Sequence, residues 1–290
     1  MGTERRVAVV KIGLVDVDSH NFPNLALMKL SAYHKAQGDS VEWFCGYSTY
    51  DLVYASKVFT FTADNGYLPD SAIRGGWGYN CDLLPDDIEH IMPDYGLYPH
   101  IDYALGFTTR GCIRKCDFCL TPSREGYIHY HASIEEFWQG QSSVVLLDGN
   151  IIASDHGLNQ LQWIADRGLK LDCNQGIDCR LVTPEIAGLL AKIRWLKPIH
   201  LALDNHYEDS LDKAVNLLRD AGATPKNYTV YCIVKPNEID DAYERVMFCK
   251  GLNCDPFAMP LDKSDKQSRH FARWVNHKAI FKTVEWKDYH

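Results

Sequence analysis

The pattern of hydrophobic and polar positions changes at residue 103. From there on, short apolar runs alternate with longer stretches in which apolar residues recur every three to four positions. Such runs are typical of buried strands, and such stretches are typical of amphipathic helices. Strands that alternate with helices predict an α/β fold with a parallel sheet. The predicted strands are residues 103–108, 144–147, 169–174, 199–203, 228–234 and 256–260, and the predicted helices are 133–139, 158–167, 184–193, 209–221 and 238–249.

The first 64 residues repeat this alternation over a shorter length. A helix is predicted over residues 25–37, and Gly38 ends it in a C-cap position. Strands are predicted at 7–14, 41–44 and 52–60. Together these elements predict a small α/β lobe.

The segment that follows, residues 65–102, contains four prolines and five glycines. So many residues that break helices and strands predict a long irregular connector. We therefore expect three parts: the small lobe over 1–64, the connector over 65–102 and a larger α/β domain over 103–290.

The tail of the chain, residues 264–290, interleaves basic and aromatic side chains. Phe271, Trp274 and Phe281 lie at helical spacing, which predicts a final helix packed on the preceding domain. A basic, aromatic surface is also found on proteins that contact nucleic acid. The formal net charge of −8 provides no overall basic field, so nucleic acid stays an unsupported alternative partner.

Composition places the chain among ordinary soluble proteins, with 46% hydrophobic and 23% charged residues. The apolar run near the N-terminus, residues 7–10, is too short for a signal peptide or a membrane span. The chain has ten cysteines, and without a secretion signal clustered thiols are more often metal ligands than disulfides. We therefore expect a cytoplasmic protein without a membrane partner.

Cys112, Cys116 and Cys119 form a CxxxCxxC triplet directly after the first predicted strand of the larger domain. An iron–sulfur cluster normally takes four cysteine ligands, so three cysteines leave one iron open to a substrate or cofactor. Two other interpretations remain open. The three thiols are inert, or they bind zinc in an interaction module without catalysis, with His129 or His131 as the fourth ligand.

The triplet, with the aromatic Phe118 just before its last cysteine, resembles the signature of the radical S-adenosylmethionine (SAM) superfamily. The resemblance covers about residues 103–260. It implies a partial (β/α)6 TIM-like barrel. The six predicted β/α units agree with this, since they are fewer than the eight that close a full barrel. It also implies an oxygen-sensitive [4Fe–4S] cluster whose open iron is chelated by SAM, with Phe118 near the adenine.

The resemblance further implies SAM-binding residues at the ends of later strands. Asp148 and Asn150 take the place where the family often has Gly-Gly-Glu, which accepts hydrogen bonds from the SAM amino group. Arg180 is placed to bind the SAM carboxylate as a bidentate fork, and Asp204 or Asn205 to bind the ribose hydroxyls. An Asp-Gly-Asn run is also a common turn, and Asp204 and Asn205 also suit the N-cap of the next helix.

Asn174, Gln175 and Asp178 follow the third predicted strand and are candidates to face the substrate. Asp178 and Tyr231 are also candidate proton or hydrogen donors. An ordinary surface ion pair between Asp178 and Arg180 is the alternative. The implied reaction is reductive cleavage of SAM to a 5′-deoxyadenosyl radical, which abstracts hydrogen from an unidentified small molecule, nucleoside or peptide. The implied partner is a one-electron donor such as flavodoxin or ferredoxin.

The N-terminal lobe resembles a shortened cobalamin-binding domain. Its Asp18-Ser19-His20 run is similar to the cobalamin-ligand motif of that domain, but Pro23 stands where the motif has glycine. We therefore expect a degenerate docking lobe without bound cobalamin. A cobalamin-dependent radical SAM methyltransferase is the alternative.

Overall fold

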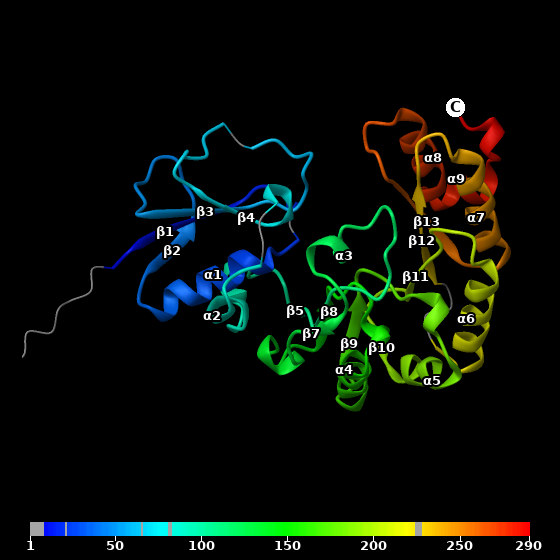
Figure 1. Ribbon diagram of the computed structural model, residues 1–290, viewed down its shortest axis with the longest axis horizontal. Helices are drawn as coiled ribbons and strands as arrows, with labels where there is room; N and C mark the ends of the chain where they lie inside the picture. Colours follow the sequence, from blue (N-terminus) through cyan, green and yellow to red (C-terminus); the bar gives the residue numbers. More distant parts are fainter. Residues whose placement is uncertain (1–8, 21, 65, 81–82, 224–227) are drawn as a thin grey trace, which may run out of the picture. The chain divides into compact units, whose positions relative to one another are not determined.

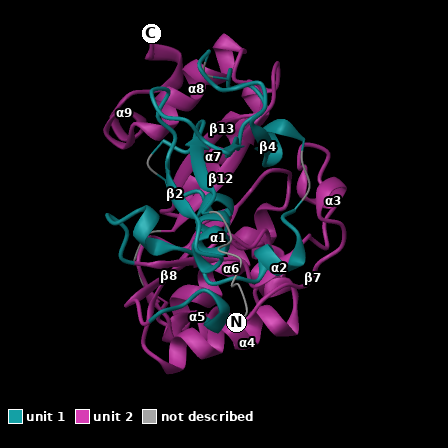
Figure 2. Cartoon of the chain, turned by 90° about the vertical axis from the view of Figure 1, so that its left-hand side faces the viewer, with its two compact units in different colours: residues 1–102, 135–139 teal, residues 103–134, 140–290 magenta. Residues whose placement is uncertain are grey.

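A computed structural model describes residues 9–20, 22–64, 66–80, 83–223 and 228–290 (Figure 1). The chain is a mixed α/β protein with parallel sheets, which confirms the predicted fold class at that level. It divides into two compact units (Figure 2). Unit 1 comprises residues 1–102 and 135–139, and unit 2 comprises residues 103–134 and 140–290.

Unit 1 contains a four-stranded parallel sheet in the order β2-β1-β3-β4. Helix α1 begins after Asn24, whose side chain accepts a hydrogen bond from the Leu27 N–H, and Gly38 follows it with a φ of +88°. Apolar residues of α1 and β1 form a buried cluster. The elements are β1 (Lys11–Asp16), α1 (Leu25–Ala36), β2 (Ser40–Trp43), β3 (Leu52–Ser56), β4 (Ile73–Gly75) and α2 (Asp86–Glu89).

The prediction of an irregular connector over residues 65–102 was wrong in part. Strand β4 lies within it and pairs in parallel with β3, with Tyr54 opposite Ile73. A strand of three residues between prolines and glycines is too short to show a period-two pattern. The predicted strand at 7–14 begins outside the described residues, and its described part overlaps β1, which extends to Asp16.

Unit 2 contains two parallel sheets in the orders β10-β9-β8-β5 and β11-β12-β13. A further parallel bridge joins Ile177, beyond the end of β9, to Leu201 in β11. Within the described residues the strands do not close into a full barrel. The strands are β5 (Ala104–Gly106), β8 (Ser143–Leu146), β9 (Lys170–Cys173), β10 (Arg194–Trp195), β11 (His200–Ala202), β12 (Thr229–Val234) and β13 (Asp255–Pro260).

Helices follow most of the strands of unit 2 (Figure 1). Ser154, Thr183 and Asp265 cap three of them through their side chains. The predicted final helix is confirmed in part, because His277 divides it into α8 and α9, and α8 packs on β13. The helices are α3 (Thr121–Arg124), α4 (Asp155–Asp166), α5 (Pro184–Lys192), α6 (Glu208–Asp220), α7 (Ile239–Gly251), α8 (Lys266–Asn276) and α9 (Lys278–Thr283).

The helix predicted over residues 133–139 was wrong, because only a single 3-10 turn, Ile134–Glu136, forms there. Gly140 follows with a φ of +94°, so the stretch has no room for the further turns that a stable helix needs. Among the described residues, no helix has the length and apolar character needed to cross a membrane.

Candidate cysteine-loop site

The three cysteines lie on one loop, residues 111–120, which we call the cysteine loop. It leaves the short strand β6 (Thr109–Arg110), and the chain returns after α3 through β7 (His129–Tyr130). The two strands pair antiparallel, with Arg110 opposite His129. Because β6 follows β5 after two residues, the loop starts at the carboxyl end of a parallel strand, where such sheets carry their ligand sites.

Gly111 and Glu125 fix the start of the cysteine loop. Gly111 has a φ of +78°, and a Cβ there would lie 2.5 Å from the Tyr127 carbonyl oxygen. The Gly111 N–H donates to Glu125 Oε2 at 2.9 Å, and Arg110 Nη1 donates to Oε1 at 2.9 Å. The Arg110 and Glu125 side chains are only 8% and 6% exposed, so this anchor is largely shielded from solvent.

Each cysteine of the loop is a partly exposed free thiol. The Arg114 backbone N–H donates to Cys112 Sγ at 3.3 Å, a contact that stabilises negative charge on a sulfur. Burial raises the pKa of the Cys116 thiol, and the charges of Cys119 and Cys112 act in the same direction. The charges of Cys112 and Cys119 therefore influence the ionisation of Cys116.

The donor chemistry of the loop fits an iron–sulfur cluster. Among the described residues, no three His, Cys, Asp or Glu side chains converge on a point where a single ion would sit. Cysteine thiolates are the ligands that iron–sulfur clusters normally take in proteins. His129, a candidate zinc ligand, is exposed and contacts the Tyr127 carbonyl oxygen at 2.9 Å through Nδ1. His131 is buried, and its ring is nearly perpendicular to that of Phe107, with centroids 6.4 Å apart.

Asp148 connects the end of β8 to the base of the cysteine loop. Its buried carboxylate accepts hydrogen bonds from the backbone N–H and the hydroxyl of both Thr108 and Thr109. Burial raises the pKa of Asp148, while these hydrogen bonds act to lower it. With so many donors already on it, Asp148 holds the chain that leads into the loop.

Asn150 differs from Asp148 because its side-chain oxygen is unsatisfied. Asn150 Oδ1 is buried, and no described residue donates a hydrogen bond to it. The intervening Gly149 lies against the loop region, since a Cβ there would be 3.6 Å from the Thr121 methyl group and 3.7 Å from the Gly111 carbonyl oxygen. A buried acceptor without a partner is uncommon in proteins, and this one follows the glycine that lies against the start of the cysteine loop.

The Asp178 carboxylate accepts hydrogen bonds from two arginines. Arg114, from the cysteine loop, donates through Nε to Asp178 Oδ2 at 2.8 Å, and Arg180 donates through Nε to Oδ1 at 2.6 Å. Burial acts to raise the pKa of Asp178, but the two guanidinium groups outweigh it and hold the pKa below its ordinary value. The Arg180 guanidinium also lies over the Tyr207 ring, 4.4 Å from its centroid.

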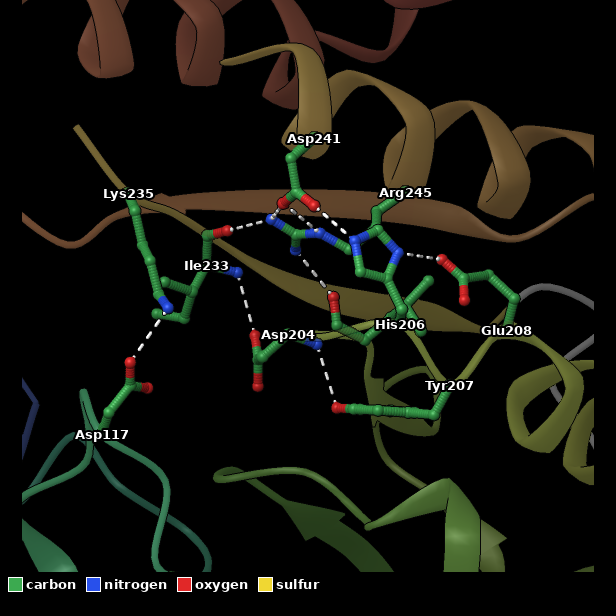
Figure 3. Close-up of polar contacts among 10 residues, drawn as sticks. Asp117, Asp204, His206, Tyr207, Glu208, Ile233, Lys235, Asp241 and Arg245 are labelled. Atoms are coloured by element: carbon green, nitrogen blue, oxygen red, sulfur yellow. Dashed lines mark hydrogen bonds and ion pairs between the residues drawn. The ribbon is translucent and has the colours of Figure 1, made fainter. Parts of the chain in front are cut away.

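Figure 3 shows how Asp204 is held at the carboxyl end of β11. Its Oδ1 accepts a hydrogen bond from the Ile233 N–H at 2.9 Å, and its own N–H donates to the Tyr207 hydroxyl at 2.9 Å. Burial raises the pKa of Asp204. The charge of Arg180 acts to lower the pKa of the Cys116 thiol, and the charge of Asp204 acts to raise it.

The other predicted site residues differ in how far they are buried. Phe118 is half-buried, and Gln175 and Asn205 are exposed. The Tyr231 hydroxyl donates to the Asn174 carbonyl oxygen at 3.2 Å, and burial raises the pKa of Tyr231 to about 12. These contacts bring Tyr231 and Asn174 together through the Asn174 backbone.

Sequence reasoning missed two features that support the site (Figure 3). Lys235, just after β12, pairs with Asp117 of the cysteine loop at 3.0 Å. Arg245, 1% exposed, donates to the carbonyl oxygens of Leu203 and Ile233 and so ties the ends of β11 and β12. The only signal for Arg245 was an Asp four residues before it on a predicted helix, a spacing typical of surface ion pairs.

No family model matches the chain, and no curated protein matches it either.

Proposed function

We propose that this chain is a radical SAM enzyme that holds a [4Fe–4S] cluster through Cys112, Cys116 and Cys119. The observation that carries the proposal is one loop with three free, partly exposed cysteines at the carboxyl end of β5. When bound, the cluster would supply the electron that cleaves SAM and so generates a radical able to abstract hydrogen from a substrate. The chain itself supplies the ligands and the surroundings that orient them.

We also infer that the strands of unit 2 form a partial (β/α)6 barrel. Sheet β5-β8-β9 and sheet β11-β12-β13 each run parallel in chain order, and the bridge between Ile177 and Leu201 joins them. Such an arrangement would gather the polar strand ends on the side that carries the cysteine loop.

SAM binding is assigned to residues that have hydrogen-bonding capacity to spare. The buried Asn150 Oδ1 lacks a donor and would accept a hydrogen bond from the SAM ammonium. Arg180 would bind the carboxylate, and Asp204, whose Oδ2 has no partner among the described residues, would accept from a ribose hydroxyl. Asp148 is engaged by Thr108 and Thr109, so we assign it a positioning role instead of contact with SAM.

The remaining parts of the proposal follow from the reaction. A one-electron donor of the flavodoxin or ferredoxin type would reduce the cluster, and this partner and the oxygen sensitivity of the cluster suit the cytoplasm. Asn174, Gln175, Asp178 and Tyr231 remain the candidates to face a small molecule, nucleoside or peptide substrate. We propose no bound cobalamin.

The test is anaerobic reconstitution with iron and sulfide, followed by SAM and dithionite and quantitation of 5′-deoxyadenosine. We expect the wild type to hold about four irons per chain and to form the product, and Cys116→Ala to form none. Cys45→Ala removes an exposed thiol of unit 1 and serves as the matched control that stays active. Colourless protein with one zinc per chain would refute the proposal.

A further inference from the structure

A cavity of about 400 Å³ opens in unit 1, at the carboxyl ends of β1 and β2. All of its lining residues belong to unit 1. Leu14 and Tyr98 are its buried members, and Asp16, His20 and Trp43 also line it. Ligands of open parallel sheets bind outside the carboxyl ends of the strands, so this cavity has the position of a binding site.

The charge around the cavity favours a cationic ligand. Asp16 is its only carboxylate, and no lysine or arginine is among the described residues that line it. Asp16 Oδ1 accepts from the Ser19 N–H at 3.1 Å, and Oδ2 accepts from the Tyr98 hydroxyl at 2.8 Å. Because a carboxylate accepts about four hydrogen bonds, Asp16 keeps capacity for a ligand, and it repels anions.

The lining also includes four aromatic side chains, Trp43, Phe44, Tyr67 and Tyr98, and the imidazoles of His20 and His100. Trp43 and Tyr98 meet edge to face, with centroids 5.3 Å apart. Trp43 is 40% exposed and Tyr67 is 73% exposed, although large aromatic rings are normally buried. Aromatic faces attract organic cations, and together with a carboxylate they form the usual recognition site for an alkylammonium group.

We propose that this cavity binds a small organic cation through an alkylammonium group, held by Asp16 and the surrounding aromatic rings. A phosphate or carboxylate ligand would meet the Asp16 carboxylate there, and no lysine or arginine among the described lining residues. The proposal is independent of the cysteine loop, since every lining residue belongs to unit 1.

The test is isothermal titration calorimetry of the full chain with choline and with 3,3-dimethylbutan-1-ol, the neutral carbon isostere of choline. We expect choline to bind with a stoichiometry of one, and the isostere to bind at least roughly tenfold more weakly because it lacks the charge. Asp16→Asn should weaken choline binding by a similar factor. Trp43→Leu should weaken it too, whereas Trp43→Phe keeps an aromatic face and should retain most of it.

Tyr47→Leu is the matched control, because its ring is fully exposed and lies outside the cavity lining. This variant should bind choline as the wild type does. Melting temperatures of all variants separate lost binding from lost folding, and the Trp43→Phe and Trp43→Leu pair keeps the test decisive if Asp16→Asn unfolds. Equal affinity for choline and its isostere, binding of a neutral nucleoside instead, or no binding up to about 10 mM would each overturn the proposal.

Discussion

The two units use the same device to fix the carboxyl ends of their parallel strands. In unit 1, the buried Asp18 follows β1 and accepts hydrogen bonds from the Val58 and Phe59 N–H groups beyond β3. In unit 2, the buried Asp148 follows β8 and accepts from Thr108 and Thr109 beyond β5. In both units, one carboxylate accepts hydrogen bonds from backbone N–H groups just beyond a neighbouring strand. These N–H groups would otherwise lack partners.

The side chains around the cysteine loop differ from those around the cavity of unit 1. Around the cysteine loop they are charged and paired, as in the contacts of Asp178 with Arg114 and of Asp117 with Lys235. Around the cavity of unit 1 they are aromatic, with the single carboxylate of Asp16. In both units the parallel sheet sets where the strand ends gather, whereas the residues after each strand set the chemistry found there.

The largest effect is expected from Gly111→Ala, which tests whether the cysteine loop depends on its first turn. A Cβ at position 111 would lie 2.5 Å and 2.7 Å from the carbonyl oxygens of Tyr127 and Gly126, with φ at +78°. We expect a loss of about 3 kcal/mol or more in the free energy of unfolding, measured by urea denaturation, together with loss of reconstituted iron.

Gly126→Ala is the matched control for this variant. Gly126 has nearly the same φ, +77°, but no atom lies within 4 Å of the added Cβ, so only about 1 kcal/mol should be lost. Gly76→Ala provides the counterpart in unit 1, where the Lys57 carbonyl oxygen lies 2.5 Å from the new Cβ. It should destabilise the protein with iron loading of the folded fraction unchanged. Equal effects of Gly111→Ala and Gly126→Ala would contradict the predicted role of the turn.

The next largest effect is expected from replacing the two buried carboxylates, Asp148 and Asp18, and it should differ between them. Asp148→Asn replaces an acceptor of four donor groups with an amide whose NH₂ faces them, and we expect a loss of roughly 3 kcal/mol. Asp18→Asn affects two backbone donors, and we expect roughly 2 kcal/mol. Urea denaturation of both variants measures the difference. A larger loss for Asp18→Asn would mean that the number of hydrogen bonds does not set the order.

Residues of the fold and the site were predictable where the signal lies within a few neighbouring positions. The apolar runs that became β8 and β12, and the cysteine triplet after the first strand of unit 2, are such local signals. Strands β4 and β10 are too short to show a pattern. The role of Asp148 could not be predicted from the sequence. The run Asp148-Gly149-Asn150 is consistent with a turn, with a ligand contact and with a hydrogen bond to Thr108, which lies 40 residues earlier.

Asp178→Asn tests whether the charged contacts of unit 2 stabilise the site. Hydrogen bonds from Arg180 and Arg114 lower the pKa of Asp178 below its ordinary value of 3.8 against the effect of burial. A carboxyl with a lowered pKa stabilises the fold above its unfolded-state pKa, and this contribution is lost as the pH falls through the folded-state value. The melting temperature of Asp178→Asn should therefore lie below that of the wild type at pH 7, and the gap should close below about pH 4.

A suitable control for the acid range is Asp70→Asn, an exposed carboxylate of unit 1. Its melting temperature should follow that of the wild type at every pH. If the gap for Asp178→Asn were constant from pH 7 to about pH 2, the two arginines would contribute through packing instead of charge.

The smallest effect is expected at His206, which lies after β11 between Glu208 and Asp241 (Figure 3). Its Nδ1 is 3.3 Å from Glu208 and its Nε2 is 2.7 Å from Asp241. The hydrogen bond to Glu208, followed by the charge of Asp241, raises the pKa of His206 above its ordinary value of 6.5. A histidine with a raised pKa stabilises the fold fully below its unfolded-state pKa, and this contribution is lost as the pH rises through its folded-state pKa.

His206→Gln should thus melt slightly below the wild type at pH 6 and together with it at about pH 9, as scanning calorimetry would measure. Glu208→Gln, which keeps the histidine, should move the loss to lower pH, and an unchanged profile would show that Glu208 does not set the pKa of His206.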